Sequence, residues 1–459
     1  MKFTKFGKAL LLSALTAGVI LSITSCIQSY SVGYLFVTGT STAQSSGSGI
    51  VSGFKINHNT GQLTAVNGLP VSSGGANPVR AVLVQAGRFL YVLNRGTTAS
   101  GGTDCTTADP CMNSNITQFA VGGNGILTPQ ETFYTQGVNP FRLIADPGGN
   151  YLFVLDHDSP NSPNNPYCAA ALGNDVHGHP ITACGDITVF AVNSTTGRLS
   201  LVTDAQATAA LSEATQLPYF PVPSYPVDFT LLGTNLLVLN GTASTDFPYG
   251  GGKTVFPYTY ASATGQLTLS QNSSQSFSNF NKGTAIINGG GTIYLLDDER
   301  PAGADSTGAT SQILPFSVGT GGSLNPLTGG PVADDATLTN PVQLLLESKS
   351  KWVYVANYGS NNTGQAGQES GIAGYLVDPT THQLSFIAGD PFGTGSGPVC
   401  IVEDPSNQYI FTANYNDSTV TGRVIDQNAG VLNDMRAPGN GTYSLTGQPS
   451  WCLISGRTD

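Results

Sequence analysis

The sequence predicts an all-β protein, a single seven-bladed β-propeller built from four-stranded antiparallel blades. Two observations lead to this prediction: a short turn motif recurs seven times, and a pair of apolar runs at a nearly constant spacing recurs with it. A third observation is that one copy is split between the two ends of the chain. The split predicts that N- and C-terminal strands pair in one blade and close the ring, which removes an open strand edge. An open solenoid, the alternative, would not need the split copy.

Each turn motif places a Leu two residues after a Gly or, in one copy, after a His. An apolar, β-rich run precedes each motif, so the Gly is expected to supply a left-handed hairpin position and the Leu to begin the next strand. The seven copies are Gly61–Leu63, Gly125–Leu127, Gly197–Leu199, Gly265–Leu267, Gly322–Leu324, His382–Leu384 and Gly430–Leu432.

The second motif gives the register of the repeat. A Pro opens an apolar run, and eleven residues later a second run begins that ends in Asn or Asp. Four copies keep this offset: Pro78 with Phe89–Asn94, Pro140 with Tyr151–Asp156, Pro341 with Trp352–Asn357, and Pro398 with Tyr409–Asn414. A shorter copy begins at Pro226 and a degenerate one at Asn281. In the split copy, Tyr34–Gly39 is the second strand and Gln448–Ile454 is the first.

The N-terminus has the pattern of a lipoprotein signal peptide, predicted to span residues 1–25. Lys2, Lys5 and Lys8 precede a short apolar stretch, and Ile23–Cys26 resembles the lipobox of bacterial lipoproteins. We therefore expect a lipid on Cys26, a tether over residues 26–33 and the propeller over 34–459. Ile27 after the Cys favours the outer membrane of the cell envelope, although the membrane face is left open. An ordinary secretory peptide is the alternative.

The net charge of the chain argues against nucleic acid as a partner. Beyond the three signal lysines, 14 basic and 28 acidic residues remain, which gives a formal charge of −14. A chain of this charge repels nucleic acid. We expect a monomer that contacts the membrane through its lipid alone.

Six cysteines remain after Cys26. Two pairs each share one predicted loop, so we expect disulfides between Cys105 and Cys111 and between Cys168 and Cys184. Cys400 and Cys452 lie on neighbouring innermost strands, but their positions after the Pro differ by one residue. Their pairing is left open. No Cys-x-x-Cys spacing favours metal ligation.

The long insertions follow the second strand of a blade, which places them on one face of the disc together with the starts of the innermost strands. Functional loops commonly gather on one side of a rigid scaffold in this way. The insertions span 95–113, 157–185, 241–253, 298–310 and 358–370.

Two sets of residues are predicted at the mouth of the central channel. The first stands two positions after each Pro and comprises Arg80, Arg142, Asp228, Gln343, Cys400 and Trp451. The second ends the second strands and comprises Asn94, Asp156, Asn240, Asp297, Asn357 and Asn414, extended by Arg95, His157, Asp158, Asp298 and Glu299. Asn and Asp also bond their own backbone where strands end, which is the structural alternative for the second set.

Two acidic clusters have oxygen ligands of the kind that calcium prefers, Asp156–Asp158 and Asp297–Glu299. A divalent cation at Asp297, Asp298 and Glu299 is therefore one hypothesis, and solvated acidic loops are the other. The chain has no Gly-x-Ser-x-Gly elbow, phosphate loop or His-Glu-x-x-His motif, so serine hydrolases, nucleotide enzymes and zinc proteases lack support.

Several strands carry a family resemblance. Tyr91–Asn94, Tyr354–Asn357 and Phe411–Asn414, together with Ile187–Phe190 and Thr196–Leu199, resemble the seven-bladed lactonase propellers and the related repeats named after a Tyr-Val-Thr-Asn motif. The resemblance covers essentially Tyr34 to Ile454. It implies hydrolysis of sugar lactones such as 6-phosphogluconolactone, or of muconate lactones, by polar groups around the channel.

The leading functional hypothesis is lactone hydrolysis at the channel mouth. Arg80 and Arg142 would bind a carboxylate or the developing oxyanion, Asp228 or an acidic mouth residue would activate water, and His157 is a further catalytic candidate. The candidate ligand-binding residues are Asn94, Asp156, Gln343, Asn357, Asn414 and Trp451. The alternative is a non-catalytic envelope module that binds a glycan or a protein. The sequence leaves open which is correct, and whether a metal takes part.

Overall fold

The computed structural model describes residues 30–42, 47–102, 105–106, 108–174, 177–203, 217–240, 254–269, 274–299, 309, 311–359, 370–436 and 438–456. The predicted signal peptide and Cys26 lie outside these residues. Within them, no helix is long and apolar enough to cross a membrane.

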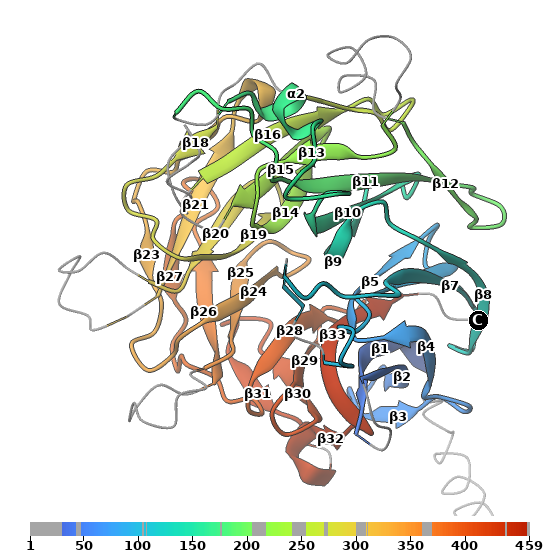
Figure 1. The fold of residues 1–459 in the computed structure, drawn as a ribbon. Coiled ribbons are helices and arrows are strands. Elements are labelled where there is room, and N and C mark those ends of the chain that lie inside the picture. Colours follow the sequence, from blue (N-terminus) through green and yellow to red (C-terminus); the bar gives the residue numbers. More distant parts are fainter. Residues whose placement is uncertain are drawn as a thin grey trace, which may run out of the picture.

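Seven antiparallel sheets surround a common centre, so the predicted all-β, seven-bladed propeller is confirmed (Figure 1). The first blade combines β33 (Gly447–Ser455), β1 (Ser31–Ser41), β2 (Ser48–Asn57), β3 (Leu63–Ala65) and β4 (Val71–Ala76). The second contains β5 (Pro78–Val84), β6 (Phe89–Asn94), β7 (Asn115–Val121) and β8 (Leu127–Phe133). The third contains β9 (Val138–Ala145), β10 (Tyr151–Asp158), β11 (Gly185–Val192), β12 (Leu199–Leu201) and β13 (Phe220–Val222).

The remaining four blades repeat this order. The fourth contains β14 (Pro226–Leu232), β15 (Asn235–Asn240), β16 (Thr254–Tyr260), β17 (Leu267–Leu269) and β18 (Gln275–Ser276). The fifth contains β19 (Gly283–Gly289), β20 (Thr292–Asp297), β21 (Gln312–Val318), β22 (Leu324–Pro326) and β23 (Val332–Ala333). The sixth contains β24 (Pro341–Leu346), β25 (Trp352–Asn357), β26 (Gly371–Val377) and β27 (Leu384–Phe386). The seventh contains β28 (Pro398–Glu403), β29 (Tyr409–Asn414), β30 (Thr419–Ile425), β31 (Leu432–Asp434) and β32 (Thr442–Ser444).

The blades differ from the prediction in one detail. Five sheets carry a fifth, short strand that pairs with the third strand of the blade, namely β4, β13, β18, β23 and β32. Helical structure in the described part is limited to α2 (Cys168–Leu172), η1 (Thr320–Gly322) and η2 (Pro438–Gly441).

Ring closure follows the split copy. β33 pairs antiparallel with β1, with Tyr34 opposite Ser455 and Ser41 opposite Gly447. In Figure 1 the red C-terminal β33 lies beside the blue N-terminal β1. The last strand therefore supplies the innermost strand of the first blade, as predicted.

The recurring turn motif has a second structural role. Each of its Gly residues, and His382, has a positive φ between 57 and 83°, and each following Leu begins a strand, as predicted. A Cβ at Gly125 would lie 2.3 Å from Tyr34 of the preceding blade, and one at Gly430 would lie 2.6 Å from Trp352. Glycine is thus needed for close approach to the neighbouring blade as well as for the turn.

The apolar core lies between blades. Each of seven buried clusters joins two neighbouring sheets, as Phe153 and Leu155 of the third blade pack with Leu236 and Val238 of the fourth. The second strands are covered on both faces, and for this reason every residue of β6, β20, β25 and β29 is buried.

Three disulfides form. Cys105–Cys111 and Cys168–Cys184 staple the two long insertions, as predicted, with Cα atoms 5.1 and 5.9 Å apart. The third joins Cys400 of β28 to Cys452 of β33, whose Cα atoms are 5.8 Å apart. The sequence left this pair open because the positions differ by one residue. The two strands belong to facing sheets, which turn opposite faces toward each other, so an offset of one residue brings the side chains together.

Candidate active site in the central channel

A β-bulge near the start of each innermost strand sets the geometry of the channel. In β5, for example, Pro78 lies opposite Asn94 and Arg80 opposite Leu93, so one extra residue separates the two pairs. The same shift recurs in all seven blades. A bulge redirects the side chain that follows it, and here that residue is Arg80, Arg142, Asp228, Ala285, Gln343, Cys400 or Trp451.

Six of these seven residues line one cavity of about 160 Å³; only Cys400, which is in the third disulfide, does not. The sequence had placed Arg80, Arg142, Asp228, Gln343 and Trp451 at the channel, and the structure brings all five together there. Ala285 belongs to the degenerate unit and was missed, because no Pro marks its register. The volume is enough for roughly five water molecules, which suits a small ring.

An ion pair crosses the cavity between the third and fourth blades. Arg142 donates through Nε to Asp228 Oδ1 at 3.0 Å. The other carboxylate oxygen of Asp228 accepts the backbone N–H of Ile286 at 3.1 Å. Asp228 is therefore fixed from two sides, and it fixes the direction of the Arg142 guanidinium in turn.

Arg80 extends into the cavity from β5 of the second blade, the neighbour of the blade that carries Arg142. Its guanidinium carbon lies 3.7 Å above the centre of the Trp451 ring, a cation–π contact across the closing blade. Burial lowers the pKa of Arg80, the positive charge of Arg142 lowers it further, and Asp228 opposes both effects. Since a guanidinium keeps its proton in proteins, two cations and one anion share this cavity.

Gln343 completes the polar lining of the cavity. Its Oε1 accepts the backbone N–H of Ile401 at 3.0 Å, so the amide NH₂ remains as a donor for a bound molecule. The channel cavity thus combines two guanidinium groups, one carboxylate and one amide. This set can hold an anionic oxygen and polarise a carbonyl.

His157 lies in a different cavity. It lines a cavity of about 380 Å³ on the face of the long insertions, here called the mouth cavity, with Arg95, Cys105, Thr106, Ala108, Asn139, Asp158 and Tyr225. Its ring stacks on Phe141 with centroids 3.8 Å apart. Burial, followed by the charges of Arg95 and Arg142, lowers the pKa of His157 to about 3. His157 therefore does not line the cavity that Arg80 and Arg142 line, although the charge of Arg142 acts on it.

The Asn and Asp residues at the strand ends lie inside the blades rather than at a cavity. Asn94, Asp156, Asn357 and Asn414 have no exposed surface, and none lines either cavity described above. Asn94 donates to Asn115 Oδ1 at 2.8 Å and to the Ser73 carbonyl at 3.1 Å. Asn94 thus links β6 to β7 of its own blade and to β4 of the first blade. Because all four residues are covered by protein, their predicted ligand-binding role is not supported.

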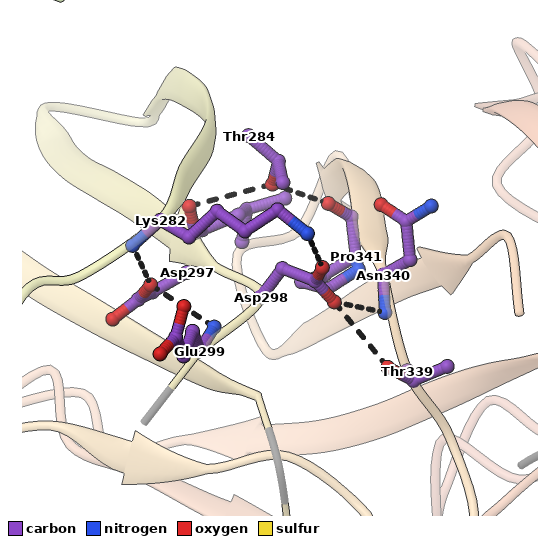
Figure 2. A network of polar contacts seen from close by, with 9 residues as sticks. Lys282, Thr284, Asp297, Asp298, Glu299, Thr339, Asn340 and Pro341 are labelled. Atoms are coloured by element: carbon purple, nitrogen blue, oxygen red, sulfur yellow. Dashed lines mark hydrogen bonds and ion pairs between the residues drawn. The ribbon is translucent and has the colours of Figure 1, made fainter. Parts of the chain in front are cut away.

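The acidic cluster after β20 forms a hydrogen-bond network, drawn in Figure 2. The carboxylate of Asp297 accepts the backbone N–H groups of Asn281, Lys282 and Glu299 and the side-chain amide of Gln312. Asp298 pairs with Lys282 Nζ at 2.6 Å and accepts the N–H of Asn340 at 2.7 Å.

These bonds bear on the predicted cation at Asp297, Asp298 and Glu299. N–H groups and an ammonium already occupy the carboxylate oxygens that a calcium ion would need. In the described residues, no group of three or more His, Cys, Asp or Glu side chains could hold a metal ion. The cation hypothesis for this cluster is therefore not supported.

Comparison with known proteins adds a family match. The model of a family described as "Lactonase, 7-bladed beta-propeller" matches residues 42–162 and 303–442. The comparison with curated proteins found no match.

Several solved structures share the fold. The periplasmic gluconolactonase of Pseudomonas aeruginosa is 18% identical with a TM-score of 0.61, covering 92% of this chain and 99% of that one. A candidate 6-phosphogluconolactonase from Bacteroides fragilis is 16% identical with a TM-score of 0.60, covering 92% and 98%. One from Bacteroides uniformis is 14% identical with a TM-score of 0.62, covering 92% and 99%. At these identities the similarity establishes the fold alone.

Proposed function

Because this chain belongs to the family of seven-bladed β-propeller lactonases, we propose that it hydrolyses a lactone bound in the channel cavity. The observation that carries the proposal is the convergence of Arg80, Arg142 and Asp228 on one small cavity. Three different blades supply these side chains through the same bulge. The rigid ring therefore holds them in place before a substrate enters, as electrostatic catalysis requires.

The two arginines stabilise the negative charge that the reaction creates. When water adds to the lactone carbonyl carbon, the carbonyl oxygen becomes an oxyanion. Arg142 is held toward Asp228 and Arg80 is held on the Trp451 ring, so both guanidinium groups are oriented before this charge appears. Asp228 balances only one of the two cations, and the oxyanion balances the other.

Asp228 is the group that accepts a proton from the attacking water. Its two oxygens each accept one hydrogen bond, from Arg142 and from the Ile286 N–H, and a carboxylate has about four acceptor positions. Room for the attacking water therefore remains. Collapse of the tetrahedral intermediate breaks the ring C–O bond, and Asp228 returns the proton to the departing oxygen. The product is the open hydroxy acid, with no other reactant consumed.

The proposed location of the protein rests on its N-terminal sequence. We propose that the lipobox at Ile23–Cys26 anchors the propeller to the cell envelope, where it meets a small-molecule lactone outside the cytoplasm. The fold similarity to a periplasmic gluconolactonase supports this placement. Replacing Cys26 by Ser should release the protein from the membrane fraction, and unchanged fractionation would contradict the anchor.

The catalytic proposal is tested with Arg142→Met in the protein without residues 1–25. Turnover of D-glucono-1,5-lactone, followed by acid release, should fall by about two orders of magnitude or more, as loss of an oxyanion donor does. The free energy of unfolding should change by less than about 2 kcal/mol.

Arg88→Met is the matched control, since Arg88 lies outside the channel cavity and donates to two backbone carbonyls of the neighbouring hairpin, Ser194 O at 3.3 Å and Thr195 O at 3.2 Å. Equal activity in the two variants would remove Arg142 from the site. Loss of stability without a selective loss of turnover would make it a structural partner of Asp228.

A further inference from the structure

The mouth cavity is the larger of the two cavities and takes no part in the proposed chemistry. Three successive blades and one insertion line it, and its volume is about 380 Å³ against about 160 Å³ for the channel cavity. Its polar and aromatic lining comprises Arg95, Thr106, Asn139, His157, Asp158 and Tyr225.

Asn139 fixes the shape of this cavity. Its side chain is buried, with 1% of its surface exposed, and it joins three segments. Oδ1 accepts the N–H of Cys111 at 2.7 Å, while Nδ2 donates to Asp158 Oδ2 at 3.0 Å and to the Thr106 carbonyl at 3.3 Å. The Cys105–Cys111 disulfide closes the same loop. The cavity is therefore formed before a ligand binds, and binding costs little free energy for ordering these groups.

The charges in the mouth cavity balance, unlike those in the channel. His157 stays uncharged at neutral pH because burial, Arg95 and Arg142 lower its pKa to about 3. Arg95 and Asp158 then contribute one charge of each sign. The cavity thus favours a neutral, polar ligand over an anion.

The lining offers both donors and acceptors beside an aromatic ring. The guanidinium of Arg95 donates, the carboxylate of Asp158 accepts, and the Thr106 hydroxyl does both. Tyr225 adds an aromatic ring with 52% of its surface exposed. Sugar hydroxyls also donate and accept, and the C–H face of a sugar ring packs on an aromatic side chain, so this combination suits a polyhydroxylated ring.

Phe141 lies between the two cavities. Its ring stacks on His157, with centroids 3.8 Å apart, and its centroid is 5.1 Å from the Arg142 guanidinium carbon. Residues of the two cavities are therefore close together, with the Phe141 side chain in contact with one from each. We infer that the mouth cavity is a subsite for an uncharged sugar unit attached to the lactone, so that the preferred substrate is a lactone carrying a further sugar. This inference rests on the lactone hydrolysis proposed above.

The test compares kcat/KM for D-glucono-1,5-lactone and cellobiono-1,5-lactone, which differ by one uncharged glucose unit. We expect at least a tenfold preference for the disaccharide lactone, expressed mainly in KM. Tyr225→Asn should reduce the preference while leaving kcat/KM for gluconolactone unchanged. Asn suits this position because Tyr225 has a left-handed backbone, φ 57°, and the equivalent residues of three other blades are Asn77, Asn139 and Asn340.

Tyr134→Asn is the matched control, since Tyr134 is also an exposed tyrosine, with 63% of its surface accessible, and does not line the cavity. If gluconolactone is hydrolysed as well as the disaccharide lactone, or if both variants behave alike, the subsite is overturned while lactone hydrolysis stands. If neither lactone is hydrolysed, the proposed function fails, and titration calorimetry with cellobiose decides the subsite. Binding that Tyr225→Asn abolishes would support a sugar site, and absence of binding would overturn it.

Discussion

The buried carboxyl pair Asp156–Asp186 predicts how the free energy of unfolding depends on pH. The two residues lie directly opposite each other on β10 and β11, and neither has exposed surface. Both oxygens of Asp156 and one of Asp186 lack a hydrogen-bond partner among the described residues. The equivalent pair of the second blade is Asn94 and Asn115, where an amide donates across the strands at 2.8 Å. In the third blade both residues of the pair are carboxyls, and among the described residues the Thr188 hydroxyl donates to Asp186 Oδ2 at 3.5 Å.

Burial raises the pKa of both carboxyls. The charge of Asp156 raises the pKa of Asp186 further. For Asp156, the nearby hydroxyls of Thr135 and Thr188 lower the pKa, while the charge of Asp158 raises it. A carboxyl with a raised folded-state pKa holds a proton that the unfolded chain has lost. Its contribution to stability is therefore complete below the ordinary carboxyl pKa of about 4 and is lost as the pH rises through the folded-state pKa. The slope reaches about 1.4 kcal/mol per pH unit for each retained proton.

Asp186→Asn should remove this dependence. The new amide can donate to Asp156 as Asn94 does to Asn115, and a hydrogen bond to a charged group contributes about 1.5 to 3 kcal/mol. We therefore expect a higher free energy of unfolding at pH 8 and a flatter profile between pH 5 and 8. Urea unfolding followed by the fluorescence of Trp352 and Trp451, the two tryptophans of the chain, measures both quantities.

Asp378→Asn is the control, because Asp378 is exposed and backbone N–H groups of Thr381 and Thr380 lower its pKa. It stays ionised throughout that pH range in the folded and the unfolded chain, so its removal should leave the profile unchanged. A parental pH profile in Asp186→Asn would refute the reasoning, since the pair would then hold no proton above the ordinary carboxyl pKa.

Three further predictions concern the ring and the mouth cavity. Removing residues 448–459 deletes most of β33 and exposes the edge of β1, so we expect aggregation; a soluble product with the parental melting temperature would contradict the closure. Cys400→Ser should lower the free energy of unfolding by about 4 kcal/mol, from the loop of 52 residues that the bridge closes; an unchanged urea midpoint without reductant would show that the bridge does not form. His157→Gln should leave the pH profile of turnover unchanged between pH 5 and 8, because the pKa of His157 is about 3; loss of a titration in that range would contradict this.

The sequence predicts the ring and the channel lining well because both follow from local register. The spacing from Pro to the next strand fixes the pairing of the first two strands, and the bulge repeats with it. Arg80, Arg142 and Gln343 could therefore be placed at one height of the channel without knowledge of the fold. The same reasoning misses Ala285, since its strand begins at Gly283 with no Pro to mark the register.

The burial of the strand-end residues could not be predicted from the sequence of one strand alone. Asn94 and Asn414 end their strands at the face of the insertions, but segments from neighbouring strands and blades cover them. Their partners include Ser73 and Asn115 for the former, and Thr419 and Thr421 for the latter. The signal that could have identified them as structural is the polar residue opposite each one at the start of the third strand.

One residue of the mouth cavity departs from the repeat in the sequence, at the position before the Pro that opens an innermost strand. Asn77, Asn139, Asn340 and Tyr225 all have positive φ angles there, between 53 and 59°. Asn tolerates this conformation, whereas a bulky side chain costs roughly 1 to 2 kcal/mol. Strain of this kind is retained where a side chain serves function. Asn139 and Tyr225 both line the mouth cavity, but Asn139 is buried whereas Tyr225 is exposed. Tyr225→Asn should therefore raise the free energy of unfolding by about 1 kcal/mol while it weakens the preference for the disaccharide lactone. A less stable variant would mean that the tyrosine is held there by packing, and the strain argument for a sugar subsite would fail.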